Sequence, residues 1–277
     1  MNKILCPVDF SDAAINALEF AAAIARKYRS KLTLINVFTE SDFNRLVGAE
    51  AVGKSFKELM AMASSRLAAL SKVISESQEG APIECNHRIE LGELTDQLRT
   101  LVKEERYDYI VMGTRGISRT NGIYFGSQTE EVIEKVNAPI LCIPESATFN
   151  GFKNLVYASD YAEEDKVAIQ DVISFATFFD SRISVLHINQ DDGDNQYKLY
   201  VEELKSFIQY SKIDFVNKEF KGAVGSGINE YIQMEKADLL VVYKQHRNFV
   251  SSFFHKSLTK TLAFSTDKPL LVLKLEA

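Results

Sequence analysis

"ILCPVDFSDAAINALEFAAAIARKYRSKLTLINVF", residues 4–38, is the stretch that decides the fold class. It opens with a short apolar run that predicts a buried strand, continues with apolar residues at helical spacing, and closes with a β-branched run that predicts another strand. Strand, helix and strand in this order predict a βαβ unit, in which the two strands run parallel. The chain is therefore expected to be an α/β protein with a largely parallel sheet.

The same pattern returns at residues 155–189, at an offset of 151 that aligns Asp9 with Asp160. Two further pairs of strand-like segments align at an offset of 130, namely 107–113 with 237–243 and 137–143 with 267–273. The chain is therefore a tandem duplication. The change of offset means that the second copy lacks 21 residues between its second and fourth strands.

Each copy reads as five strands that alternate with helices, with a loop before the last helix. Right-handed crossovers between such strands predict a doubly wound parallel-sheet domain. The 277 residues suit two domains of this kind, since domains cluster near 100–150 residues. Turn-forming residues interrupt the periodicity at 144–152, and we predict domains at 1–147 and 148–277.

Composition narrows the classes of partner. The net charge of −6 comes from 32 basic and 38 acidic residues that are scattered along the chain, so nucleic acid is not an expected partner. The apolar runs are too short for a membrane span, and we expect no signal peptide, because the first strand-like run begins at Lys3. We therefore expect a cytoplasmic protein without membrane contact. Cys6, Cys85 and Cys142 lie in strand-like runs and are expected to be buried, reduced thiols.

The segment "GTRGISRTNGIYFGSQTEE" at 113–131 follows the fourth strand, which we expect to end at Met112. A helix is expected to begin near Ser127. Ligands of doubly wound sheets bind beyond the carboxyl ends of the strands, where helix N-termini present unpaired N–H groups. This loop is therefore a candidate binding site.

Three glycines of the loop are open to two explanations. Gly113 and Gly116 would let the backbone approach a phosphate and adopt positive φ, and Gly126 would leave space where the helix begins. Ser127 and Thr129 add hydroxyl donors. The alternative is that the glycines only make turns.

A second glycine pattern competes with the first. The letters "GAEAVGKS" at 48–55 satisfy the P-loop pattern. A P-loop needs a buried strand immediately before its first glycine, whereas the nearest expected strand ends at Phe38. No apolar run that ends in a Mg²⁺-binding aspartate follows in this copy. We therefore predict that Lys54 lies at a solvated helix start, at the beginning of one long amphipathic helix over 50–77.

The polar residues outside the loop carry less information. Asp9 follows the first strand, where it could cap the next helix in competition with Ser11, face a ligand, or do both. His87 and His187 fall in strand-like runs, which favours core packing over catalysis. No catalytic residue is predicted.

The motif G-x2-G-x9-G-[ST] is matched without a gap by Gly113, Gly116, Gly126 and Ser127. In this motif and over its whole length, as two copies, the chain resembles the universal stress protein family. The resemblance implies that "PVDFS" at 7–11 is the segment whose aspartate lies near adenine and ribose. It further implies that "GSQTE" at 126–130 is the phosphate-binding turn, and that the backbone after the second strand receives the adenine edge.

The resemblance therefore implies an ATP site in the first copy, with or without Mg²⁺. The residues expected to form it are Pro7, Val8, Asp9, Val37, Met112, Gly113, Thr114, Arg115, Gly116, Gly126, Ser127, Gln128 and Thr129.

The second copy departs from the motif. Tyr243, His246 and Lys256 stand where the first copy has its three glycines, and only Ser257 is kept. The added side chains predict that the phosphate cradle is lost. The basic residues nearby either form a small anion pocket or are exposed loop residues; they are Lys244, His246, His255 and Lys256.

The functional expectation is an ATP-binding regulatory protein of the stress response, whose second domain has a structural or interaction role. A slow ATPase and a ligand-free scaffold are the alternatives. The two copies are expected to pair within the chain through the apolar strands at 139–143 and 269–273, because an exposed apolar edge strand aggregates. A homodimer and a regulatory protein partner are also compatible with the family resemblance.

Overall fold

A computed structural model describes residues 1–39, 55–77, 80–114, 127–161, 165–189, 195–244 and 267–274. The described residues divide into two compact units, and the chain passes from the first to the second between Glu145 and Ser146. No helix within these ranges is both long enough and apolar enough to cross a membrane.

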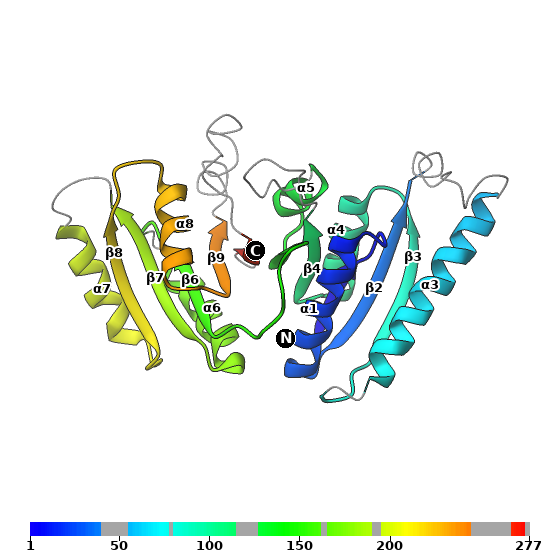
Figure 1. Ribbon diagram of the computed structural model, residues 1–277, viewed down its shortest axis with the longest axis horizontal. Helices are drawn as coiled ribbons and strands as arrows, with labels where there is room; N and C mark the ends of the chain where they lie inside the picture. Colours follow the sequence, from blue (N-terminus) through cyan, green and yellow to red (C-terminus); the bar gives the residue numbers. More distant parts are fainter. Residues whose placement is uncertain are drawn as a thin grey trace. The chain divides into compact units, whose positions relative to one another are not determined.

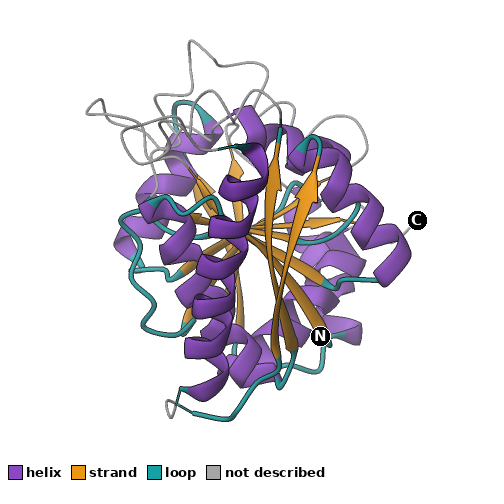
Figure 2. Ribbon diagram, turned by 90° about the vertical axis from the view of Figure 1, so that its right-hand side faces the viewer, coloured by secondary structure: helices purple, strands orange, loops and turns teal. Residues whose placement is uncertain are grey.

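The first unit is a five-stranded sheet whose strands are all parallel. Along the chain its elements are β1 (Lys3–Pro7), α1 (Asp12–Tyr28), β2 (Lys31–Phe38), α3 (Phe56–Glu76), β3 (Cys85–Leu91), α4 (Leu94–Glu105), β4 (Tyr109–Thr114), α5 (Ser127–Lys135) and β5 (Ile140–Pro144). The strand order is β3-β2-β1-β4-β5. Helices cover both faces of the sheet (Figures 1 and 2).

The second unit repeats this arrangement. Its elements are β6 (Asn154–Ala158), α6 (Asp165–Phe179), β7 (Arg182–Asn189), α7 (Asn195–Phe207), β8 (Ile213–Glu219), α8 (Val224–Met234), β9 (Leu239–Lys244) and β10 (Leu270–Lys274). The strand order β10-β9-β6-β7-β8, again parallel throughout, is that of the first unit. The predicted fold class, two doubly wound parallel-sheet domains, is confirmed.

The difference in length between the copies lies between the second and third strands. Residues 39–84 separate β2 from β3, whereas residues 190–212 separate β7 from β8. The sequence placed the missing residues between the second and fourth strands, and the structure narrows this range to the segment between the second and third. The predicted long helix is α3, whose N-cap Ser55 forms a capping box with Glu58. Its counterpart α7 has 13 residues against 21 in α3. Residues 50–54, including Lys54, lie outside the described residues.

The amino-terminal edges of the two sheets are built alike. Asp108 accepts hydrogen bonds from the backbone N–H groups of residues 2 and 3 at 2.6 and 2.8 Å. Asp238 does the same for residues 153 and 154 at 2.8 and 2.9 Å. In each unit, this carboxylate ties the start of the fourth strand to the start of the first. We call this arrangement the aspartate clamp.

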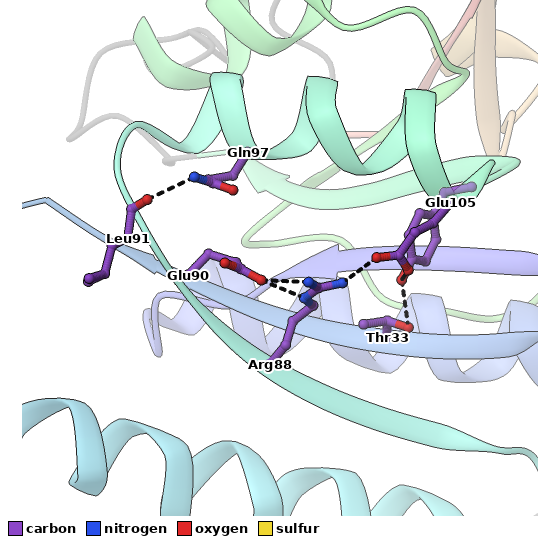
Figure 3. A network of polar contacts seen from close by, with 7 residues as sticks. Thr33, Arg88, Glu90, Leu91, Gln97 and Glu105 are labelled. Carbon is purple, nitrogen blue, oxygen red and sulfur yellow. Dashed lines mark hydrogen bonds and ion pairs between the residues drawn. The ribbon is translucent and has the colours of Figure 1, made fainter.

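Polar contacts hold α4 on the outer half of the first sheet. Figure 3 shows Arg88, on β3, pointing toward Glu105 at the end of α4. Arg88 Nη1 donates to Glu105 Oε1 at 2.7 Å, and Arg88 Nε donates to Glu90 at 2.8 Å. The Tyr107 hydroxyl donates to Glu105 Oε2 at 3.3 Å and lies within hydrogen-bonding distance of Thr33 Oγ1 on β2, at 3.1 Å. The network therefore spans α4, β3 and β2.

The interior of each sheet is apolar. Both central strands are buried along almost their whole length, and α1 presents a row of buried alanines to the sheet. Small side chains let a helix approach a sheet closely, which matters for the site below. Cys6, Cys85 and Cys142 are buried, as predicted, and none forms a disulfide bond within the described part of the chain.

Candidate functional site

The carboxyl edge of the first sheet leaves part of the β2 backbone beyond the end of β1. The parallel ladder between the two strands ends at the pair Pro7 and Ile35, and the N–H of Val8 donates to the carbonyl of Ile35 at 2.8 Å. Alternate residues of a strand direct their backbone groups to the same side. The N–H and C=O of Val37 therefore face the same side as those of Ile35, past the end of the paired ladder.

Asn36 closes the end of β1. Its Nδ2 donates to the carbonyl of Val8 at 2.6 Å, and the side chain is 5% exposed. Val8 itself is buried. In a longer β1–β2 ladder, a backbone N–H of β2 would donate to the carbonyl of Val8. Here the side-chain amide of Asn36 donates to that carbonyl instead, and it fixes Val8 beside Val37.

Asp9 lies at this edge with an exposed carboxylate. Its Oδ1 accepts from the N–H of Ser11 at 3.0 Å and from Ser11 Oγ at 2.5 Å. Ser11 in turn is the N-cap of α1 and accepts from the N–H of Ala14. Of the two competing caps, Ser11 therefore caps the helix and Asp9 orients it. Asp9 Oδ2 makes no hydrogen bond within the described residues.

Phe10, between Asp9 and Ser11, adopts a left-handed φ of 64°. The guanidinium carbon of Arg66, on α3, lies 4.4 Å from the centre of the Phe10 ring. The left-handed residue turns the chain sharply from β1 into α1 and directs its ring toward α3.

Gly113 has a different physical role from the one expected. It lies inside β4, which extends two residues beyond the predicted end at Met112, and it is not among the residues with positive φ. A Cβ at this position would lie 2.5 Å from the carbonyl oxygen of Ala13. The expectation of positive φ at Gly113 is therefore wrong, and its missing side chain is explained by the close approach of α1 to β4.

The neighbours of Gly113 are buried. Met112 is in the core, and Thr114 is buried with its Oγ1 donating to the carbonyl of Ile143 on β5 at 3.3 Å. The backbone of β4, rather than these side chains, therefore reaches the carboxyl edge.

α5 begins at Ser127, as predicted. Gln128 is exposed in its first turn, and Thr129 is buried. A helix that follows a parallel strand runs back along the sheet, so its N-terminus and unpaired N–H groups lie at the carboxyl edge. Three of the expected site residues, Arg115, Gly116 and Gly126, lie outside the described residues.

Comparison with known proteins gives the family. The chain matches the universal stress protein family over residues 1–144 and again over residues 151–274. The chain belongs to the universal stress protein family. It is 28% identical over 151 residues to a universal stress protein of Methanocaldococcus jannaschii, an alignment that covers 51% of this chain and 93% of the relative. A universal stress protein of Bacillus subtilis is 24% identical over 147 residues, which cover 51% of this chain and 98% of the relative.

A solved structure matches both copies together. The crystal structure of a universal stress protein from Archaeoglobus fulgidus has a TM-score of 0.78 and 17% sequence identity, and the match covers 99% of this chain and 98% of that chain. At this identity the likeness establishes the fold.

The second unit keeps the universal stress protein fold but fills the same edge with polar and aromatic side chains. Asp165, the first residue of α6, is only 2% exposed. Its Oδ2 accepts from Ser159 Oγ at 2.6 Å and from the Tyr200 hydroxyl at 2.8 Å, and its Oδ1 accepts from the Tyr157 hydroxyl. We call these four residues the buried aspartate cluster.

The sequence analysis did not identify this cluster, although the repeat contains a signal for it. At the offset of 151, Asp165 stands where the first copy has Ala14, and Tyr157 stands where it has Cys6. A carboxylate aligned with a core alanine predicts a compensating set of donors.

The hydroxyl groups of the cluster remain protonated. Burial, and then the charge of Asp165, raises the pKa of both Tyr157 and Tyr200 above the ordinary tyrosine value. Both can therefore donate to the carboxylate at neutral pH. In the first unit, burial raises the pKa of the Cys6 thiol, with a smaller contribution from Cys85. Cys6 is thus an inert core thiol rather than a nucleophile.

The two strand histidines differ. His87 is exposed on β3, so the expectation that it packs in the core is wrong. The edge position of β3 explains this exposure, because only β2 pairs with it among the described strands. His187, on β7, is half-buried and lies within hydrogen-bonding distance of the carbonyl of Ser159, at 3.0 Å. Across the described ranges, no three His, Cys, Asp or Glu side chains gather where they could hold a metal ion.

Proposed function

We propose that the first unit binds one adenine nucleotide, ATP with or without Mg²⁺, at the carboxyl edge of its sheet, and that the chain acts as a nucleotide-dependent regulatory protein of the stress response. One observation carries the proposal: the backbone of Val37 extends past the paired end of β1, beside the exposed carboxylate of Asp9. A backbone N–H and C=O on one residue match the acceptor and donor of the adenine edge.

The other residues of this edge fit the remaining parts of a nucleotide. Asp9 Oδ2 can accept a hydrogen bond from a ribose hydroxyl, while Oδ1 stays with Ser11. The unpaired N–H groups at the start of α5 suit phosphate oxygens. Ser127, Gln128 and Thr129 form that first turn. The sequence motif adds Gly116 and Gly126 to the proposed phosphate-binding loop.

In this proposal the second unit does not bind nucleotide and has a structural or interaction role. Tyr243 stands at the position aligned with Gly113 and is 4% exposed, so the second unit buries a side chain at a position where the backbone of Ala13 excludes one in the first unit. Pairing of the two copies within the chain, a homodimer, a regulatory protein partner and a cytoplasmic location are parts of the same proposal.

Titration calorimetry with ATP tests the proposal through its stoichiometry. We expect one site per chain in the wild type. Gly126→Lys, which installs the residue of the second copy, should weaken binding at least about 30-fold, because a blocked cradle loses two or more hydrogen bonds of about 1 kcal/mol each. Lys54→Ala is the matched control and should stay within about twofold, well under the 1.4 kcal/mol of a tenfold change.

Each alternative gives a different result in the same titration. Two sites per chain would show that the second unit also binds. No heat of binding, together with the absence of nucleotide from the purified protein by mass spectrometry, would favour a ligand-free scaffold. A large loss in Lys54→Ala would revive the P-loop hypothesis.

A further inference from the structure

Both units turn from the first strand into the first helix through an aromatic residue in the same backbone conformation. Phe10 has φ of 64°, and Tyr161, which aligns with it at the offset of 151, has φ of 61°. In each unit this residue follows an aspartate at the carboxyl edge, Asp9 or Asp160. The backbone is therefore shared, and the two units differ in what the ring contacts.

In the second unit the ring lies within an aromatic group. The Tyr161 ring stacks on His187, with centroids 3.7 Å apart and planes 19° apart. It also lies 4.6 Å from the ring of Tyr200 and 5.8 Å from that of Tyr197, both on α7. The tyrosine thus bridges the end of β7 and the helix that covers it.

Hydrogen bonds fix the surroundings of this ring. A carbonyl oxygen only accepts, so His187 Nδ1 carries the hydrogen and donates to Ser159. The N–H of Tyr161 donates to Ser159 Oγ at 3.2 Å, and the same Oγ donates to the buried carboxylate of Asp165. The ring therefore rests on a polar framework that is itself hydrogen-bonded.

The first unit has apolar or smaller residues at the aligned positions. Cys6, Val8 and Ala14 stand where the second unit has Tyr157, Ser159 and Asp165. Asn36 aligns with His187 and makes the equivalent bond to the end of the first strand. Phe10 contacts the exposed Arg66 instead of a ring on β2. The framework that holds Tyr161 is therefore specific to the second unit.

We propose that the Tyr161 side chain occupies, in the second unit, the place that the nucleoside takes in the first, and that this place is a slot that fits one planar aromatic ring. His187 immediately precedes Ile188, the residue that aligns with Val37, so the stacked ring lies at the edge where the first unit leaves backbone open. The inference rests on the proposed function only for the position of the nucleoside. The second unit is thus closed by its own aromatic residue, rather than merely lacking phosphate-binding glycines.

Single-tryptophan reporters test the closure, because the chain contains no tryptophan. Tyr161→Trp places the reporter in the stack, and Phe10→Trp is its matched control in the first unit. We expect blue-shifted emission and several-fold lower acrylamide quenching in Tyr161→Trp, with no response to ATP. The emission of Phe10→Trp should respond to ATP. Equal quenching in the two variants, or a response of Tyr161→Trp to ATP, would overturn the proposal.

A second measurement tests the slot itself. Tyr161→Ala should bind 4-methylphenol, the side chain of tyrosine, because truncation leaves a space of that size between the rings of His187, Tyr197 and Tyr200. The melting temperature of Tyr161→Ala should therefore rise with that ligand. Wild type and Phe10→Ala should show no such rise. If folded Tyr161→Ala behaves as the wild type does, no slot exists.

The two tests separate this proposal from the proposed function. If Tyr161→Ala does not fold, even with the phenol present, the tryptophan reporters decide. ATP could change the emission of neither Phe10→Trp nor Tyr161→Trp, while acrylamide still quenches Tyr161→Trp less than Phe10→Trp. That result would contradict nucleotide binding by the first unit and would support the proposal that Tyr161 closes the second unit.

Discussion

The two units share the amino edge of their sheets and differ at the carboxyl edge. Asp108 and Asp238 make the same clamp with nearly the same distances. At the opposite edge, Gly113 is replaced by Tyr243 and Ala14 by Asp165. The comparison teaches that the contacts which both units keep for the fold lie at one edge of the sheet. The residues that the proposed function assigns to the nucleotide lie at the opposite edge, so one set can change while the other is kept.

The largest expected effect comes from moving the second unit's residue into the first. Gly113→Tyr places a side chain where a Cβ already lies 2.5 Å from the backbone of Ala13, and we expect a loss of more than about 4 kcal/mol in the free energy of unfolding. Thermal and urea unfolding followed by circular dichroism measure it.

The control for this prediction is another glycine. Gly151 has φ of 87° and no atom within 4 Å of a Cβ. Gly151→Ala should therefore cost only backbone strain, about 1 kcal/mol. Similar losses in the two variants would contradict the close approach between α1 and β4.

The next effect concerns the buried aspartate cluster. Asp165→Ala leaves the hydroxyls of Tyr157, Ser159 and Tyr200 without their shared acceptor, and should cost about 3 kcal/mol. Hydrogen exchange should show that the lost protection lies in the second unit. Asp165→Asn, which keeps one carbonyl acceptor, should lose less. Equal stability of Asp165→Ala and the wild type would mean that the cluster does not hold the second unit together.

The aspartate clamp is present in both units, so we expect its removal to lower the free energy of unfolding by the same amount in each. Asp108→Ala and Asp238→Ala each remove two hydrogen bonds to backbone N–H groups, and each should cost about 1–2 kcal/mol. Chemical unfolding of the two variants measures the losses. A clear difference between them would show that the clamp has diverged along with the carboxyl edge.

The smallest effect depends on pH and is confined to the first unit. The hydrogen bond from Arg88 lowers the pKa of Glu105, with a smaller opposing effect of burial. The pair therefore contributes stability above the unfolded pKa of about 4.3, and this contribution disappears as pH falls through the lower folded pKa. Because Glu105 is partly exposed, Arg88→Met should cost about 0.5 kcal/mol at pH 7. Urea unfolding of the wild type and Arg88→Met at pH 7 and pH 3 measures this difference in the free energy of unfolding. An equal difference at the two pH values would contradict the assignment of the stabilisation to ionised Glu105.

Most of the fold could be predicted from the sequence because its signals are local. The apolar periodicity of residues 4–38 and its return at 155–189 set the order of strands and helices. The start of α5 at Ser127 was predictable for the same reason. The offset between the copies placed the deletion only approximately, because the third strands carry a weak pattern.

The candidate site was less predictable, since its contacts join distant parts of the chain. Gly113 looked like a ligand-binding glycine, but the atoms that exclude a side chain there belong to Ala13 on another element. Asp165 and Tyr200 meet only because α6 and α7 follow neighbouring strands. His87 was misjudged because a β pattern does not reveal which strand lies at the edge.

The central position of β1 has a consequence for how the protein is made. β1 pairs with β2 on one side and with β4 on the other, and β4 begins at Tyr109, roughly a hundred residues after β1 ends at Pro7. At about 5–20 residues per second, a ribosome needs about 5–20 s to extend the chain that far. Throughout that interval β1 has no second strand to pair with, and unpaired apolar strands associate with other chains. We therefore expect one side of β1 to stay open to association with other chains until the fourth strand has been synthesised.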